Sequence, residues 1–370
     1  MDAVIFLVGA LILALALWDI FQTIVVPRPT PGRFRIARYV VPPTWRLWRR
    51  IATRKSDAAA RDAFLGFYAP GVAVLLLVMW VAVMILGYGL ILFALRGEIR
   101  PIPTSLGEAL YFAGTSVLTL GFGELVATGG LARLVVLIGA VTGLGVVALV
   151  ITFLFSLYAS YQRREVLVVT LAARAKSPPS AVALLETYAR LDMVDELPAL
   201  FRDWELWTAE VLDSHVAFPL LGYFRSSHDN ISWISALGAV LDAAALVLTT
   251  VKNVPRGQAE ITKRVGAHLV EDIANILRRP AEEVTVDRVD FEAVYRRLGV
   301  AGYELEPLDH AWRAFRRFRA TYAGRLEVLA EFWVTPAPSW AGHHRKASAS
   351  AVHAPERDPE TEREPEPIEA

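Results

Sequence analysis

The stretch that decides the fold is Ser105–Glu124, which reads SLGEALYFAGTSVLTLGFGE. Its first part, residues 106 to 118, has the composition of a short helix, and Ser105 is a suitable N-terminal cap for it. Gly121 and Gly123 then alternate with larger residues, and glycine adopts backbone conformations that other residues avoid. Apolar runs long enough to cross a bilayer lie on both sides of this segment. The pattern predicts a short helix and a glycine-containing loop held between two membrane helices.

The six residues Thr119-Leu120-Gly121-Phe122-Gly123-Glu124 resemble the selectivity filter of potassium channels, for which Thr-Val-Gly-Tyr-Gly is a well-known pattern. The resemblance implies that the backbone carbonyls of residues 119 to 123 bind a desolvated potassium ion, and that the Thr119 hydroxyl adds one oxygen. It implies that Leu120 and Phe122 point outward against the surrounding helices. Glu124 stands where the family usually has Asp, and it would concentrate cations at the outer mouth or brace the pore helix.

The resemblance extends to residues around the filter and covers roughly residues 64 to 165. Tyr111 and Phe112 occupy the position of an aromatic pair that supports the filter, and Thr115 lies behind the filter where some members carry Glu. Arg133 corresponds to an outer-mouth arginine. Gly143 corresponds to an inner-helix hinge, for which close packing is the alternative explanation.

Two residues depart from the family pattern in a way that bears on selectivity. Leu120 replaces the usual Val or Ile, and Leu118 replaces a usual Thr or Ser. Both changes leave a carbonyl-lined filter possible, so a weakly selective cation channel remains an alternative to a potassium-selective one.

Composition and charge support a membrane half followed by a soluble half. The 370-residue chain is 54% hydrophobic and contains no cysteine, which excludes disulfides and thiolate metal sites. Residues 1 to 161 hold 13 Lys/Arg against 7 Asp/Glu, whereas the remainder has an acidic excess. The sequence has no basic patch with interleaved aromatic residues that would indicate nucleic-acid binding. It also has no catalytic constellation that would indicate an enzyme.

We expect five parts along the chain: an N-terminal transmembrane helix (1–26), a basic loop (27–63), the pore domain (64–165), a helical cytoplasmic domain (166–335) and a disordered, acidic and Pro-rich tail (336–370). Short basic loops stay in the cytoplasm. The chain is therefore expected to be a multi-pass protein of the cell membrane, with its N-terminus and filter outside and its C-terminal domain inside. Asp19 in the first helix is expected to be either a coupling residue or a carboxylate paired with a loop arginine.

The basic loop contains an amphipathic pattern that predicts a helix lying in the membrane interface. Its apolar face would carry Trp45, Trp48 and Ala52, and the residues flanking this face are Arg46, Arg49 and Arg50. These arginines would bind anionic lipid headgroups or act only as a topology determinant and anchor.

The soluble half shows helical periodicity in residues 181–190, 194–214, 231–251, 257–278, 288–298 and 307–334. The apolar segment 231–251 is long enough to be considered as a fourth span. It carries Asp242, and basic residues follow it, so a buried bundle helix is the better interpretation.

The sequence thus predicts an all-α membrane protein with three transmembrane helices, a re-entrant pore helix and filter loop, and a helical cytoplasmic domain. One filter loop per chain implies a homotetramer, and the permeant ion would be potassium with no other cofactor. A non-conducting membrane sensor or scaffold is the remaining alternative. A potassium-uptake transporter subunit would need four such loops in one chain, which this sequence lacks.

Overall fold

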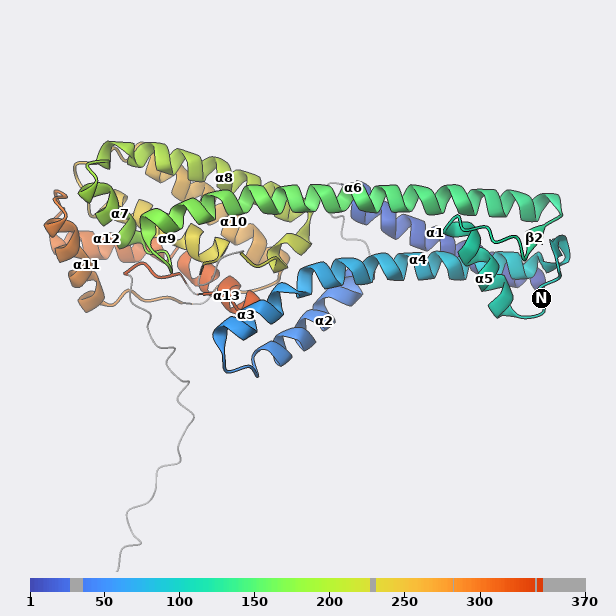
Figure 1. Cartoon of the computed structure of the whole chain (residues 1–370). Helices are drawn as coiled ribbons and strands as arrows, with labels where there is room; N and C mark the ends of the chain where they lie inside the picture. The colour runs from blue at the N-terminus through green and yellow to red at the C-terminus, as the bar shows by residue number, and fades with distance from the viewer. Residues whose placement is uncertain (27–35, 227–230, 282, 337, 342–370) are drawn as a thin grey trace, which may run out of the picture.

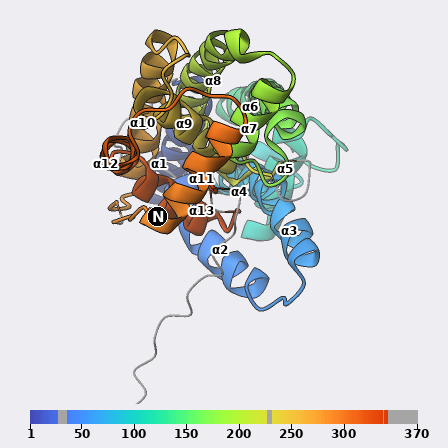
Figure 2. The same cartoon turned by 90° about the vertical axis from the view of Figure 1, so that its left-hand side faces the viewer.

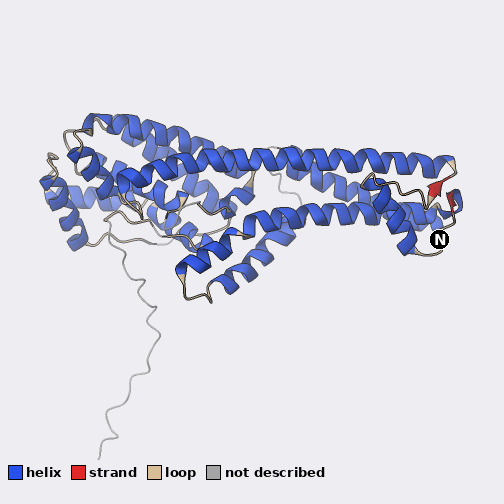
Figure 3. Ribbon diagram, in the orientation of Figure 1, coloured by secondary structure: helices blue, strands red, loops and turns tan. Residues whose placement is uncertain are grey.

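The computed structural model describes residues 1–26, 36–226, 231–281, 283–336 and 338–341. A bundle of helices forms one end of the molecule, and a long arm of parallel and antiparallel helices forms the other (Figure 1). Three helical segments are long and apolar enough to cross a membrane: Asp2–Val25, Ala58–Ala94 and Gly130–Ala175. The protein is therefore an all-α membrane protein with three long apolar helices, as predicted. In the part described, β-structure is confined to two short strands, red in Figure 3, and two isolated bridges that are not drawn as strands.

Helix α1 (Asp2–Ile20), which continues as a π-helical turn at Phe21–Val25, packs along α4 (Tyr68–Ala94). The two helices approach closely where Gly9 meets Gly87, because a Cβ atom on Gly9 would lie 2.7 Å from the Gly87 carbonyl oxygen. Asp19 is buried at the other end of this contact. Its carboxylate accepts hydrogen bonds from the Trp80 indole (2.7 Å) and from the backbone N–H of Ile36 (2.9 Å). Asp19 thus joins α1, α4 and the first residue of α2. Residues 27–35, which include three arginines of the basic loop, lie outside the described residues.

Helix α2 (Ile36–Ala52) is amphipathic as predicted, but the expectation that its apolar face lies in lipid is wrong. Trp45 is 2% exposed and contacts the rings of Tyr68 and Tyr223, and its indole N–H donates to the Phe332 carbonyl. An amphipathic pattern only requires that the apolar face be covered, and here the C-terminal bundle covers it. Arg49 forms an ion pair with Glu331 (3.1 Å), while Arg46 and Arg50 are exposed.

Helix α3 (Ala58–Gly66) leads into α4, and η2 (Arg96–Glu98) and α5 (Leu106–Val117) follow. Helix α6 (Gly130–Ala175) is one uninterrupted helix of 46 residues, which corresponds to about 70 Å. It extends well beyond the predicted span, because its C-terminal third continues into the bundle (Figure 1). The same helix therefore passes the loop at residues 119–123 at one end and contacts the bundle at the other.

The bundle, viewed end-on in Figure 2, surrounds helix α9 (Trp233–Thr249). Asp242 in α9 is fully buried and accepts hydrogen bonds from Arg319 (3.1 Å) and Tyr322 (2.7 Å). This burial agrees with the prediction of a bundle helix rather than a fourth span. The other helices of the bundle are α7 (Ala181–Arg190), α8 (Leu197–Ala217), α10 (Gly257–Ile276), α11 (Arg288–Val300), α12 (Leu308–Arg319) and α13 (Ala323–Trp333), with η3 (Val194–Glu196) and η4 (Pro219–Tyr223) between them.

Two predictions for the bundle require correction. Residues 307–334 form two helices, α12 and α13, because the chain turns between them and places Tyr322 against Asp242. The predicted disordered tail does not begin at residue 336, since Trp340 is 9% exposed and contacts Phe291 and Phe315. Residues 342–370 lie outside the described residues.

Candidate functional site

Helix α5 begins and ends close to where the sequence predicts. The Ser105 hydroxyl accepts a hydrogen bond from the Glu108 N–H (3.3 Å), and the Glu108 carboxylate accepts from the N–H (2.8 Å) and hydroxyl (2.9 Å) of Thr104. These bonds satisfy backbone donors that a helix N-terminus leaves free. The helix ends after Val117, so that the chain enters the glycine-containing loop directly from its C-terminus.

The loop backbone alternates in handedness. Thr119, Gly121 and Gly123 have φ angles of +57°, +56° and +82°, whereas Leu120 and Phe122 are not among the positive-φ residues. In an extended strand successive carbonyls point to opposite sides, and reversing every second residue turns them toward one side. Glycine adopts this conformation without a steric penalty, but a threonine with positive φ is unusual. The sequence contains no signal for the left-handed conformation of Thr119.

Hydrogen bonds fasten the loop to α5. The Thr115 carbonyl accepts from the N–H of Leu120 (2.8 Å) and of Gly121 (3.3 Å). The Tyr111 hydroxyl donates to the Glu124 carboxylate (2.9 Å), which is the brace that sequence reasoning offered as one role for Glu124. Phe112, the third predicted support residue, is buried in the middle of α5. The structure thus brings Tyr111 and Thr115 into direct contact with the loop.

A second set of contacts holds the far end of the loop, and sequence reasoning missed its main residue. Strand β1 (Ile99–Arg100) pairs antiparallel with β2 (Val126–Ala127). The Glu98 carbonyl accepts from Thr128 N–H (2.7 Å), and the Glu98 carboxylate accepts from Ala132 N–H (2.9 Å) in the first turn of α6. The Arg133 guanidinium donates to the Ala127 carbonyl (3.2 Å), so this arginine holds β2 in place.

Gly143 lies at the closest approach between α6 and the end of α5. A Cβ atom there would lie 2.0 Å from the Val117 carbonyl oxygen, far inside van der Waals contact. Nearby, the Tyr88 hydroxyl and Thr142 hydroxyl are 2.7 Å apart and join α4 to α6. Because α6 is uninterrupted, the structure gives Gly143 a close-packing role, and its role as a hinge stays a prediction.

Large apolar side chains around the loop are exposed in the single chain. Leu120 is 54% and Phe122 is 64% exposed, so more than half of each side chain is left uncovered by its own chain. The prediction that both point against surrounding helices stays a prediction. A cavity of about 600 Å³ opens between the loop, α5 and α6. An exposed apolar stripe continues along α6 and includes Leu137, Val141, Leu144, Ile151 and Phe155. The carbonyl-bearing loop and its apolar surroundings are therefore open on one side.

At its other end, α6 is fixed to the bundle by the buried Arg164. From the sequence, this residue is interpreted only as a basic residue at the end of the membrane span. Arg164 is 2% exposed, and its guanidinium donates to the carbonyls of Leu221 and Phe224 (both 2.9 Å) and pairs with Glu165 (3.0 Å). Burial and the neighbouring Arg164 charge lower the pKa of His215 to about 3, so that this imidazole is neutral.

The fold and the site define a membrane protein with the pore domain of an ion channel. Residues 76–160 match the sequence model of a family described as "Ion channel", and this segment contains most of α4, the whole of α5, the loop and most of the membrane part of α6. This match supports an ion channel.

A relative in Bacillus subtilis (strain 168), "Uncharacterized membrane protein YdjJ", is 26% identical over 205 residues. The match covers 54% of this chain and 58% of that protein, so it spans little more than half of either. No solved structure matches the chain.

Proposed function

We propose that four copies of this chain surround a shared axis and pass potassium ions down their gradient through the loop Thr119–Gly123. The observation that carries this proposal is the positive φ at residues 119, 121 and 123, which alternate with Leu120 and Phe122. A reversal at every second residue would turn successive carbonyls toward one side. Carbonyl oxygens so arranged can replace the water shell of a potassium ion. One loop supplies oxygens from one side only, and a closed symmetric ring of loops completes the cage.

The exposed apolar surfaces support the same assembly. Phe122 is 64% exposed in one chain, and it would be buried once the pore helices of neighbouring chains pack around the loop. The outward stripe of α6, from Leu137 to Phe155, would line the axis or the contact with the next subunit. The tetramer therefore covers the surfaces that one chain leaves open.

Glu124 fits two roles in this proposal. Its bond with Tyr111 braces the loop against α5, and its negative charge at the loop's end attracts cations. The basic loop between α1 and α3 favours an orientation with the C-terminal bundle in the cytoplasm of the cell and the filter outside. Arg46 and Arg50 remain exposed and are suited to contact anionic headgroups, whereas Arg49 is engaged by Glu331.

A weakly selective monovalent cation channel is the second candidate, and it is favoured by Leu118 and Leu120, which differ from the usual filter sequence. Reversal potentials separate the two candidates. A potassium-selective pore gives a potential that follows the potassium gradient in mixed sodium and potassium solutions, whereas a weakly selective pore gives a value near zero.

A flux assay with purified protein in liposomes tests conduction itself. Gly121→Ala forces a side chain onto a left-handed residue and should abolish potassium and rubidium flux while tetramers remain intact. Gly97→Ala is the matched control, since its Cβ would meet no neighbour and its φ is not positive. Normal flux through the Gly121→Ala protein would exclude the filter assignment. Absence of flux in the unmodified protein would favour a non-conducting sensor or scaffold.

A further inference from the structure

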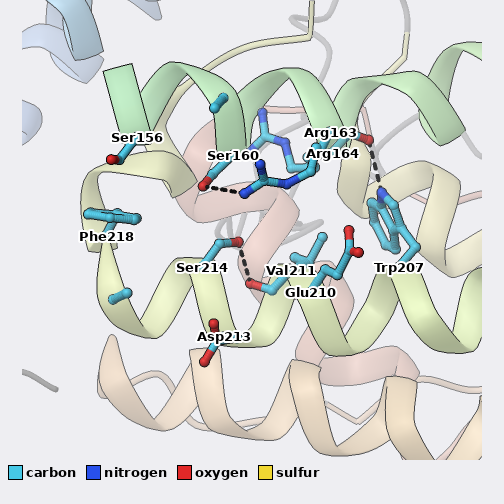
Figure 4. Close-up of a pocket in the computed structure, with 12 residues that line it drawn as sticks. Ser156, Ser160, Arg163, Arg164, Trp207, Glu210, Val211, Asp213, Ser214 and Phe218 are labelled. Atoms are coloured by element: carbon cyan, nitrogen blue, oxygen red, sulfur yellow. Dashed lines mark hydrogen bonds between the residues drawn. The ribbon is translucent and has the colours of Figure 1, made fainter. Parts of the chain in front are cut away.

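A polar cavity of about 540 Å³ lies between α6 and α8, next to the site where Arg164 joins the two parts of the molecule (Figure 4). Its volume is typical of small-molecule sites. The walls carry hydroxyl groups from both helices, contributed by Ser156, Ser160 and Ser214. None of the functions proposed above uses this cavity.

The length of α6 places the cavity near the membrane surface on the bundle side. Measured from Leu131, α6 crosses the hydrocarbon layer of about 30 Å in about 20 residues. Ser156 and Ser160 then fall in the layer of lipid headgroups. Phe218 closes the membrane-facing end of the cavity, where its ring contacts Phe153 at 5.4 Å between centroids. A lipid headgroup at this depth can reach the polar walls without leaving the membrane.

Opposite charges line opposite walls. On α6, Arg163 is exposed and donates one hydrogen bond to the Ser160 hydroxyl (3.1 Å). On α8, Glu210 and Asp213 are exposed, and Figure 4 shows Glu210 pointing toward α6. Within the described residues no ion pair joins Arg163, Glu210 or Asp213 to a partner. The buried Arg164, by contrast, is neutralised by Glu165 and held by backbone carbonyls.

This separation of charge selects the chemistry of a ligand. A purely anionic group would be repelled by Glu210, and a purely cationic group by Arg163. A ligand with both charges satisfies both walls: an anionic oxygen accepts from the Arg163 guanidinium and the Ser160 hydroxyl, and an ammonium donates to the Glu210 carboxylate. We propose that this cavity binds a zwitterion joining a primary ammonium to a phosphodiester, as in an ethanolamine phospholipid or its soluble headgroup.

Competitive lipid binding tests the proposal independently of ion flux. The full-length protein is incubated in micelles with equal amounts of phosphatidylethanolamine, phosphatidylcholine and phosphatidylglycerol, and the retained lipid is counted by native mass spectrometry. The quaternary ammonium of choline cannot donate a hydrogen bond, and glycerol carries no positive charge. We expect about a tenfold preference for the ethanolamine lipid, because only its primary ammonium can donate a charge-assisted hydrogen bond to Glu210.

Arg163→Gln and Glu210→Gln should each reduce this preference to within about twofold, because each removes one charge of the matching pair. The controls are Arg174→Gln on α6 and Asp203→Asn on α8, which are exposed on the same helices but do not line the cavity. Equal retention of the three lipids by the unmodified protein, or a preference that survives both cavity variants, would overturn a lipid headgroup as the ligand.

A second arm identifies the source of the ligand. Glycerophosphoethanolamine is titrated by calorimetry into the protein held in phosphatidylcholine nanodiscs. If glycerophosphoethanolamine binds, Arg163→Gln and Glu210→Gln weaken this binding, and no lipid is preferred, the ligand is a soluble zwitterion. If the protein prefers the ethanolamine lipid and the two variants reduce that preference, the ligand is a membrane lipid. If neither probe binds in a way that Arg163→Gln and Glu210→Gln weaken, the proposal is wrong.

Discussion

Substitution of Gly143 by Ala tests how the inner helix is connected to the filter. The new Cβ would lie 2.0 Å from the Val117 carbonyl oxygen, and Cβ contacts in proteins rarely fall below 3.0 Å, so α6 and α5 must separate by about 1 Å. Such overpacking costs about 1–3 kcal/mol. Val117 is two residues from Thr119, so the displacement reaches the inner end of the loop. We expect potassium flux in liposomes to fall at least about tenfold, since filter coordination depends on fixed carbonyl positions.

Two further substitutions separate close packing from a hinge. Gly139→Ala is the control, because its Cβ would lie 3.6 Å from the Tyr88 ring, an ordinary contact, and flux should be retained. Gly143→Pro favours a bent helix, so a hinge predicts sustained flux, whereas close packing predicts the same loss as Gly143→Ala. Flux and thermal stability of Gly143→Ala equal to those of the unmodified protein would refute the packing argument.

Three other predictions concern the brace, the bundle and the docking of α2. Tyr111→Phe removes the hydrogen bond to Glu124, worth about 1 kcal/mol, and should lower the potassium-over-sodium permeability ratio several-fold in reversal-potential measurements. An unchanged ratio would show that this hydrogen bond does not brace the loop. The pKa of His215 is lowered to about 3 in the folded protein, against about 6.5 in the unfolded chain. Between these pH values the unfolded state binds more protons than the folded state. The free energy of unfolding therefore falls as pH falls, by roughly 1 kcal/mol for each pH unit. Thermal melts between pH 7 and pH 4 should show this slope, and His215→Gln should reduce it; an identical slope in both proteins would contradict the assignment. Trp45→Ala empties a buried site between α2 and the bundle and should destabilise the protein by about 3–5 kcal/mol, while Trp18→Ala on the exposed face of α1 should change the melting temperature little. Equal shifts from the two variants would show that α2 is not held by the bundle.

The membrane half could be predicted from the sequence because its signals are local. Helix α5 follows from the Ser105 cap and its apolar composition, and the bend of the loop after it follows from Gly121 and Gly123. The covering of the Trp45 face could not be predicted, because an amphipathic pattern shows which face is apolar and does not show whether lipid or protein covers it. Glu98 was missed for a related reason: its bonds to Thr128 and Ala132 join segments about 30 residues apart.

The most direct test of the central claim is an electron-microscopy map of the full-length protein in nanodiscs with potassium. The account predicts four chains around one axis, with density for ions on that axis between the carbonyls of residues 119 to 123. A map in which this loop lies away from any shared symmetry axis, or in which the particles are monomers or dimers, would contradict it.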